Sequence, residues 1–219
     1  MTENGTLPMA SPGDLPSFDR VYLASRSPRR RELLAQIGVR FDTLLFRAGQ
    51  RADPEIDETP RPGEAAAAYV RRLAIDKARH GRRLLVWRKL AARPLLSADT
   101  ALEVNGDIIG KPAGHDDAFA VLRRLAGRSH RVLTGVAASF GKETKTFVNI
   151  SVVRFCPLDD AAIRRYVASN EPLDKAGAYA IQGGAGLFVE HISGSFSGIM
   201  GLPLYETGLL LKAAGYRFT

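Results

Sequence analysis

The 219-residue sequence contains one cysteine, Cys156, and one tryptophan. A single cysteine excludes an internal disulfide and a cysteine-based zinc site. No apolar run is long enough to cross a bilayer, and the first 20 residues lack the basic and apolar regions of a signal peptide. These absences predict a cytoplasmic protein without a membrane partner.

Several common catalytic patterns are also missing. The sequence has no Gly-x-Ser-x-Gly elbow and no Walker loop, which excludes the usual serine hydrolases and P-loop kinases. No two of the four histidines have the spacing with which one helix binds a metal: His80, His115, His130 and His191.

Acidic residues are outnumbered. Lys and Arg total 31 against 23 Asp and Glu, so the formal net charge is +8 and the sequence pI is about 9.9. This balance favours an acidic partner, but it does not separate a nucleic acid from a small phosphorylated ligand.

The pattern along the chain predicts one domain. Residues 1–19 are rich in Pro, Ser, Gly and Thr and are expected to be a disordered leader, whereas 20–219 suit a single domain. We expect helices over 28–37, 63–83, 116–126, 158–168 and 203–214. Strands are expected over 21–24, 39–46, 95–98, 101–104, 107–109, 130–140, 144–155 and 187–192, with a Gly-rich irregular loop over 170–186. The fold class is therefore α/β, with a mixed sheet flanked by helices.

The first strand passes into a helix through a turn rich in hydroxyls and arginines. Ser27 takes the N-cap position, Pro28 the first helical position, and three arginines follow. Cations oppose the helix dipole there. Free N–H groups, a hydroxyl and several guanidiniums would together bind a polyanion such as a nucleotide phosphate chain. A solvated basic face is the alternative.

Two carboxylates are candidates for the chemistry. Asp99 is expected at the end of the short strand 95–98, at the carboxyl edge of the sheet where α/β proteins bind ligands. Glu58 belongs to an acidic loop with Asp53, Glu55 and Asp57, and could join Asp99 in holding Mg²⁺ or Mn²⁺. A strand-end Asp that caps a turn and a solvated loop Glu are the alternatives.

Three longer polar side chains could contact a nucleotide. Lys77, expected near a helix end, and Lys111, between Gly110 and Pro112, are candidate phosphate contacts. Gln182 offers a donor and an acceptor together, as contact with a base edge requires. Each of the three could instead be an ordinary surface side chain.

Six motifs in order resemble the Maf-like family of nucleoside triphosphate pyrophosphatases, relatives by fold of inosine triphosphate pyrophosphatases. They are LASRSPRRRELL from Leu23, IDE from Ile56, LAIDKA from Leu73, SADT from Ser97, GKP from Gly110 and LDKAGAYAIQGGAG from Leu173. The resemblance implies an elongated sheet, two lobes with a cleft, and members that often form dimers. The departures are the expected disordered leader, Arg26, where the family usually has a small residue, and an enlarged basic segment, 79–93.

The resemblance also implies the substrate and the roles of residues. The SPRR, ADT and AYAIQG forms are similar to the dTTP/UTP subtype, in which Arg29, Thr100 and Gln182 would set base choice. Hydrolysis between the α and β phosphates would release pyrophosphate, as Asp99 activates water beside a divalent cation shared with Glu58. The phosphates would be contacted by Ser27, Arg29, Arg30, Lys77 and Lys111.

Two alternatives stay open at this point. One is a pyrophosphatase for another base, such as 7-methyl-GTP. The other is a basic nucleic-acid-binding or division-regulating protein without catalysis. Nucleic-acid modules usually interleave aromatics with basic residues, and Trp87 is the one aromatic within 79–93, so no stable nucleic-acid partner is expected.

Overall fold

The structure is a computed structural model that describes residues 17–46 and 56–218. Within these ranges, one seven-stranded sheet has the order β2-β1-β3-β5-β6-β7, and β4 pairs with β3. Its strands are β1 (Val21–Leu23), β2 (Phe41–Thr43), β3 (Leu95–Val104), β4 (Asp107–Ile109), β5 (Ser129–Phe140), β6 (Glu143–Phe155) and β7 (Val189–Ser193). Parallel pairs join β1 to β2 and β3, and the other pairs are antiparallel. The predicted mixed α/β sheet is confirmed.

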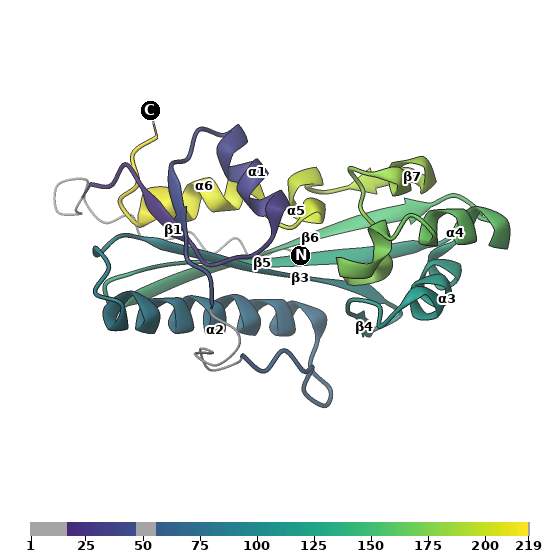
Figure 1. Cartoon of the computed structure of the whole chain (residues 1–219), viewed down its shortest axis with the longest axis horizontal. Helices are drawn as coiled ribbons and strands as arrows, with labels where there is room; N and C mark the ends of the chain where they lie inside the picture. The colour runs from purple at the N-terminus through teal and green to yellow at the C-terminus, as the bar shows by residue number, and fades with distance from the viewer. Residues whose placement is uncertain (1–16, 47–55, 219) are drawn as a thin grey trace.

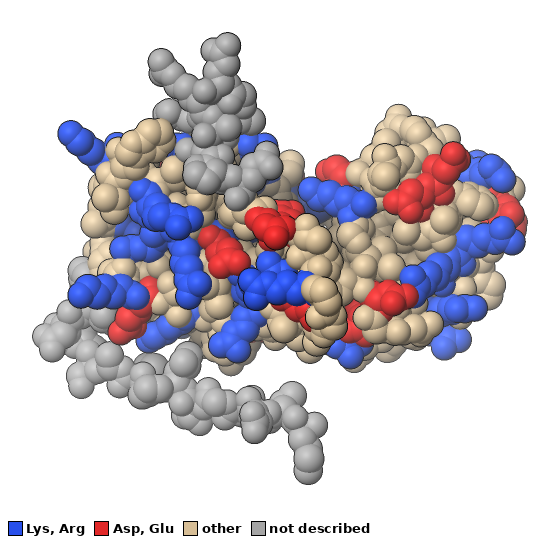
Figure 2. All heavy atoms as spheres, turned by 90° about the horizontal axis from the view of Figure 1, so that it is seen from below, with Lys and Arg blue, Asp and Glu red and all other residues tan. Residues whose placement is uncertain are grey.

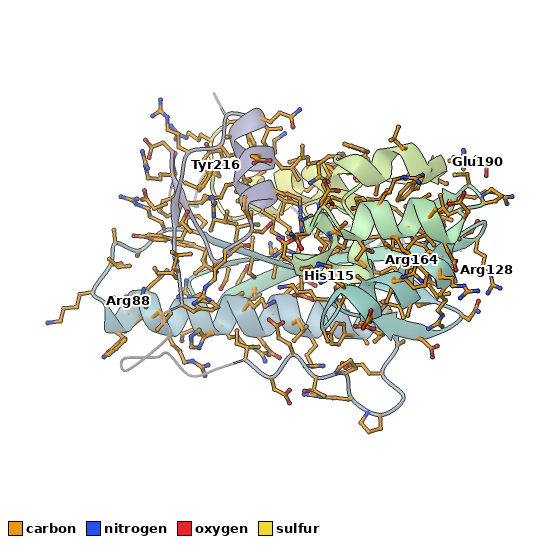
Figure 3. All side chains as sticks on the ribbon, turned by 45° about the vertical axis from the view of Figure 1, so that its right-hand side comes forward. Arg88, His115, Arg128, Arg164, Glu190 and Tyr216 are labelled. Atoms are coloured by element: carbon orange, nitrogen blue, oxygen red, sulfur yellow. The ribbon has the colours of Figure 1, made fainter. Side chains whose placement is uncertain are left out.

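Helices cover both faces of this sheet (Figure 1). The helices are α1 (Pro28–Gln36), α2 (Ala66–Trp87), α3 (His115–Leu125), α4 (Asp160–Val167), α5 (Phe196–Met200) and α6 (Leu204–Ala213). The long helix α2 runs along one face, whereas α1, α5 and α6 lie on the other. Helices α3 and α4 pack together at one end, where Arg128, Arg164 and Glu190 lie, and Tyr216 lies at the opposite end (Figure 3).

The core follows these layers. Leu34, Leu96 and Leu210 are fully buried between the sheet, α1 and α6, and Phe155 and Ile163 are buried at the α3–α4 end. Burial of each such side chain stabilises the fold by about 1.5–3 kcal/mol.

Helix α2 lies very close to the sheet at Gly135 of β5. A Cβ atom built there would be 2.3 Å from the backbone oxygen of Val70. This glycine therefore lets the α2 backbone settle directly on the strand.

The prediction that Asp99 lies at the end of a strand is wrong. Strand β3 is continuous from Leu95 to Val104, so Asp99 lies in its middle and not at a strand end. Pairing of Asp99 with Gly135 and of Thr100 with Thr134 in β5 carries the strand through the polar Asp-Thr pair.

The edge of β3 that faces away from β5 is only partly covered. Strand β1 pairs with Leu95 and Leu96, and β4 pairs with residues 102–104. Among the described strands, none pairs with residues 97–101 on this edge. The sheet is thus open beside Asp99.

Other boundaries also differ from the predictions. Helix α2 continues to Trp87 because buried Gly81, Leu84 and Leu85 extend its apolar stripe beneath the arginines, so Lys77 lies mid-helix. Strand β2 is shorter than the predicted strand 39–46. Helix α3 begins at His115, and its N-cap is Gly114 and not the predicted Asp116. The predicted irregular loop contains three short 3₁₀ turns within residues 171–188. Helix α5 was not predicted, although Ser195 caps it.

The end of the predicted leader packs against the domain. Phe18, which falls in the expected leader, pairs with Tyr216 and packs on Phe140 with ring centroids 4.7 Å apart. The remainder of the leader, residues 1–16, and the loop carboxylates Asp53 and Glu55 lie outside the described residues.

Candidate active site

A cavity of about 1020 Å³ lies at the open edge of β3. Its walls come from the β1–α1 turn, the middle of α2, β3, the segment after β4 and the Gly-rich loop before β7. All nine residues selected from the sequence line it: Ser27, Arg29, Arg30, Glu58, Lys77, Asp99, Thr100, Lys111 and Gln182. The topology therefore brings together residues that are up to 155 positions apart, from 27 to 182.

The N-terminus of α1 forms one wall. Ser27 caps the helix, its hydroxyl accepting from the backbone N–H of Arg30 at 3.5 Å, and Pro28 begins it as predicted. The backbone N–H of Ser27 donates to Ser25 Oγ at 3.2 Å. Arg29 lines the cavity at this helix end, where a bound anion would meet both the guanidinium and the helix dipole.

Arg30 is turned inward against the protein. Its Nε donates to the backbone oxygen of Gly201 at 2.7 Å, and Nη1 donates to that of Ala98 at 2.7 Å. Nη2 donates to Thr100 Oγ1 at 3.1 Å. Burial lowers the pKa of Arg30, while the charge of Asp99 opposes the decrease. Arg30 thus bonds a carbonyl on the open edge of β3 and contributes positive charge to the cavity wall.

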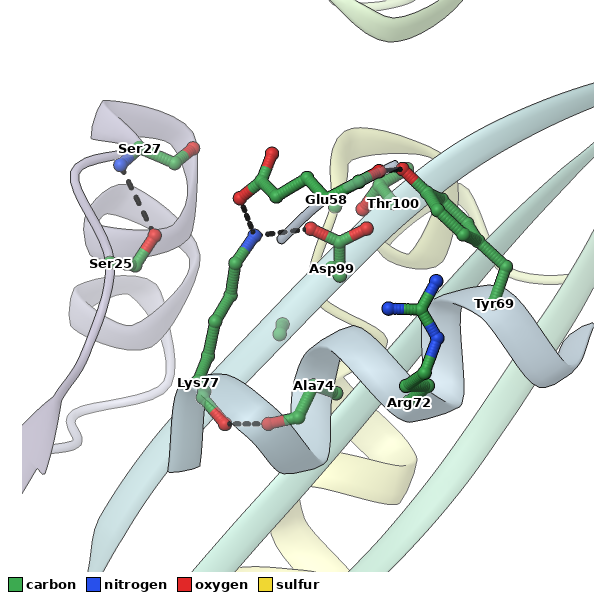
Figure 4. A network of polar contacts seen from close by, with 12 residues as sticks. Ser25, Ser27, Glu58, Tyr69, Arg72, Ala74, Lys77, Asp99 and Thr100 are labelled. Atoms are coloured by element: carbon green, nitrogen blue, oxygen red, sulfur yellow. Dashed lines mark hydrogen bonds and ion pairs between the residues drawn. The ribbon is translucent and has the colours of Figure 1, made fainter. Parts of the chain in front are cut away.

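Lys77 joins the two candidate carboxylates (Figure 4). Its Nζ lies 2.5 Å from Asp99 Oδ1 and 2.7 Å from Glu58 Oε1. The side chains of Lys77 and Asp99 are 15% and 12% exposed, whereas that of Glu58 is 57% exposed. A mid-helix lysine, a mid-strand aspartate and a loop glutamate therefore meet at one point.

The charges around Glu58 keep it ionised. Partial burial opposes ionisation, but Lys77 outweighs it, with further contributions from Lys111 and Arg30, and the net effect lowers the pKa of Glu58. Tyr69 lies on the same wall and donates from its hydroxyl to the backbone oxygen of Glu58 at 2.8 Å. Burial, together with the charges of Asp99 and Glu58, raises the pKa of Tyr69 to about 12, so this hydroxyl remains a donor.

The Gly-rich loop forms another wall. Tyr166 and Glu171 brace it, since the Tyr166 hydroxyl donates to Glu171 Oε1 at 2.6 Å and the backbone N–H of Gly184 donates to Glu171 Oε2 at 3.2 Å. The loop presents exposed Gln182 and partly buried Lys175 to the cavity.

The carboxylate pair fits a hard divalent cation. Both carboxylates already converge on the ammonium of Lys77, and Mg²⁺ is commonly bound by one or two carboxylates together with substrate phosphates and water. Within 17–46 and 56–218, no group of three or more His, Cys, Asp or Glu residues could hold a metal ion. A metal here would therefore complete its coordination with water and with oxygens from the substrate.

Tyr69, Lys175 and Thr134 are among the cavity or near-cavity residues that were not selected from the sequence. Tyr69 resembles an ordinary apolar position of an amphipathic helix, and Lys175 lies within the LDKAGAY motif without a separate signal. Thr134 of β5 is buried and shares a hydrogen bond with Thr100, their Oγ1 atoms lying 2.9 Å apart. Only the pairing of β3 with β5 identifies it.

The face of the molecule shown in Figure 2 is not a continuous basic surface. Lys and Arg side chains are spread over that face with acidic side chains among them. No described helix is long and apolar enough to span a membrane.

A cavity that places cationic side chains and a helix N-terminus around two carboxylates defines a protein that binds a polyanion and can activate water beside it. The family model described as "Maf-like protein" matches residues 20–214, and the chain belongs to this family.

Curated relatives of high identity carry one name, "dTTP/UTP pyrophosphatase". The protein of Dechloromonas aromatica is 62% identical over 90% of this chain and 98% of its own length, and that of Aromatoleum aromaticum is 60% identical over 90% and 96%. The protein of Burkholderia lata is 53% identical over 97% of this chain and all of its own length. A solved structure of the Staphylococcus aureus Ham1 protein overlaps with a TM-score of 0.43 at 17% identity, over 62% of this chain and 71% of that one, which is too little to bear on activity.

Proposed function

We propose that this chain hydrolyses dTTP and UTP between the α and β phosphates, releasing the nucleoside monophosphate and pyrophosphate. The observation that carries the proposal is the Asp99–Lys77–Glu58 cluster inside a cavity whose walls also bear Arg29 and Lys111. The names of relatives that are more than 50% identical support the choice of substrate.

Asp99 is the group that orients and deprotonates the attacking water. It is 12% exposed, and its backbone is held within the sheet by pairing with Gly135 of β5, so it is a rigidly placed acceptor. Lys77 binds Asp99 Oδ1, which leaves Oδ2 to accept from a water molecule. A positioned general base contributes on the order of 100-fold to 10,000-fold in rate.

The cationic side chains neutralise the triphosphate. Arg29 and Lys111 lie on the walls and would contact phosphate oxygens, with Ser27 and the N-terminus of α1 completing the contact. Lys77 lines the cavity as well as binding Asp99, so its ammonium would also contribute positive charge toward the phosphates. Arg30 is engaged with backbone carbonyls and acts through its charge.

We further propose Glu58 and Asp99 as ligands of Mg²⁺ or Mn²⁺ bound together with the substrate. When bound, such a cation polarises phosphate oxygens and lowers the pKa of coordinated water. When no cation is bound, the ammonium of Lys77 keeps the two carboxylates close together, because two negative charges would otherwise repel each other.

Base choice is assigned to Arg29, Thr100 and Gln182. Thymine and uracil present two carbonyl acceptors on either side of an N–H donor, and an arginine, a hydroxyl and an amide can meet that pattern together. We also propose that the enzyme acts in the cytoplasm, where its substrates are found, and that it forms a homodimer. Sedimentation velocity of the full chain would test the dimer.

A panel of nucleoside triphosphates tests the function. Purified full-length chain is incubated with Mg²⁺ or Mn²⁺ and each of dTTP, UTP, dCTP, CTP, GTP, ATP and 7-methyl-GTP, and pyrophosphate is quantified. The proposal expects the highest kcat/KM for dTTP and UTP. Preference for 7-methyl-GTP, or the absence of pyrophosphate with every substrate, would overturn it.

A further inference from the structure

We propose that Arg72 of α2 is a positioning residue for Glu58, acting through the backbone of the segment that carries this glutamate. The inference rests on the proposed function, because Glu58 matters to turnover only if the cavity hydrolyses a nucleotide. Residues 56–65 form neither helix nor strand, so the place of Glu58 depends on contacts made by side chains from elsewhere.

Three consecutive backbone carbonyls of this segment are held by α2. Arg72 Nη1 donates to the oxygen of Asp57 at 3.2 Å, and Arg72 Nη2 donates to the oxygen of Thr59 at 3.1 Å. Between them, the hydroxyl of Tyr69 donates to the oxygen of Glu58 at 2.8 Å. Tyr69 and Arg72 are three residues apart, so they share one face of the helix, and the guanidinium lies 5.5 Å from the centre of the ring (Figure 4).

Arg72 is itself fixed by a bidentate ion pair. Its Nε and Nη2 lie 2.7 Å from the two carboxylate oxygens of Glu64, and the two side chains are 13% and 9% exposed. The hydrogen bond from Arg72 is the main cause that lowers the pKa of Glu64 to about 2, so the pair stays charged. Glu64 Oε2 also accepts from the backbone N–H of Arg61 at 3.0 Å, so the end of the same segment is connected to α2 through Glu64 and Arg72.

This arrangement explains how an exposed loop residue reaches a fixed position. The Glu58 side chain is 57% exposed, and its carboxylate is bound by Lys77 at 2.7 Å. One ion pair at that exposure contributes little on its own. The planar guanidinium of Arg72 donates to the Glu64 carboxylate and to two carbonyls at once, which a lysine ammonium cannot reproduce. Arg72 therefore fixes the backbone on both sides of Glu58, and this backbone position places the Glu58 carboxylate beside Lys77 and Asp99.

A double-mutant cycle tests this dependence. Pyrophosphate release from dTTP is measured for wild type, Arg72→Met, Glu58→Gln and the double variant, with enzyme concentrations high enough to follow Glu58→Gln. We expect Arg72→Met to lower kcat/KM by about 10-fold to 100-fold, the range for residues that support the ligands of an active site. In the Glu58→Gln background the same substitution is expected to change kcat/KM less than 2-fold.

Matched controls separate positioning from a general structural effect. Arg71→Met makes the same change at the neighbouring exposed position and is expected to leave kcat/KM within 2-fold of wild type. Tyr69→Phe removes one of the three carbonyl contacts while keeping the ion pair. Tyr69→Phe is expected to lower kcat/KM a few-fold in the wild-type background and to leave kcat/KM unchanged in the Glu58→Gln background. If Arg72→Met does not fold, the proposal is tested by Tyr69→Phe alone.

Three outcomes would overturn the proposal: wild-type kcat/KM in folded Arg72→Met, equal fold losses in the wild-type and Glu58→Gln backgrounds, or, where Arg72→Met does not fold, the same two results for Tyr69→Phe. Failure of the proposed function is distinguishable, since wild type itself would then release no pyrophosphate.

Discussion

Lys77 Nζ lies 2.5 Å from Asp99 Oδ1, so a lysine from the middle of α2 and an aspartate from the middle of β3 form an ion pair on the cavity wall. The pair spans two elements that pack directly on each other, which fixes the aspartate without a strand end or turn.

Substitution of Asp99 by asparagine keeps the shape of the side chain and removes the base. We expect kcat to fall on the order of 100-fold or more while the chain remains folded. Pyrophosphate release and thermal unfolding are measured together. Asp76→Asn, the same change at a partly exposed α2 position that pairs with Arg79, is the control and should retain wild-type activity. Full activity in folded Asp99→Asn would remove Asp99 from this role.

The hydrogen bonds around Thr100 determine the direction in which its hydroxyl donates. Thr134 Oγ1 donates to the backbone oxygen of Gly198 at 2.8 Å, so its remaining contact with Thr100 Oγ1 is that of an acceptor. Thr100 thus donates a hydrogen bond to Thr134, accepts one from Arg30, and offers a ligand only its remaining acceptor position, which suits the N–H of thymine and opposes the ring nitrogen acceptor of cytosine. Thr134→Val should lower the ratio of kcat/KM for dTTP over dCTP on the order of tenfold, as measured by substrate competition. An unchanged ratio would contradict this account of base choice.

His130 gives the fold a pH dependence. Its Nε2 lies 2.8 Å from the Tyr179 hydroxyl, and burial lowers the pKa of His130 to about 4. Between pH 6.5 and 4 the unfolded chain binds a proton that the folded chain does not, so the free energy of unfolding falls as pH decreases, by no more than about 3 kcal/mol. Urea unfolding of wild type and His130→Gln at pH 7.5 and 5.5 measures the difference. The wild type should lose more stability than the variant, and equal losses would contradict the prediction.

Two glycines should respond oppositely to alanine. Gly135→Ala places a Cβ 2.3 Å from the Val70 oxygen and must push α2 off the sheet, which costs about 1–3 kcal/mol. At Gly208, within α6, nothing lies within 4 Å of the added Cβ, so alanine should stabilise the helix by about 0.5–1 kcal/mol. Urea unfolding checks both signs. Similar midpoints for the two variants would show that the contact at Gly135 is not tight.

Local signals predicted much of the molecule, because they act over a few residues. The Ser27 cap, the Asn105-Gly106 turn and the long strands joined at Gly141 all follow from such signals and are confirmed. The continuity of β3 through Asp99 could not be predicted in this way, since pairing with β5 overrides the polar interruption.

The site shows the same division. Sequence motifs identified the nine cavity residues, but the hydrogen-bond and ion-pair partners of each residue depend on tertiary geometry. The sequence predicts the same role, phosphate contact, for Arg29 and Arg30, and both line the cavity, but only tertiary geometry shows that the guanidinium of Arg30 is bonded to backbone oxygens of Ala98 and Gly201. The link from Glu64 through Arg72 to the backbone beside Glu58 likewise joins residues whose spacing carries no signal by itself.

The identity of the products tests the central claim most directly. Wild-type chain is incubated with dTTP and a divalent cation, and the phosphorus species are followed by ³¹P NMR. Cleavage between the α and β phosphates predicts dTMP and pyrophosphate in equal amounts, with no dTDP formed. Appearance of dTDP with inorganic phosphate, or unchanged dTTP, would contradict the account.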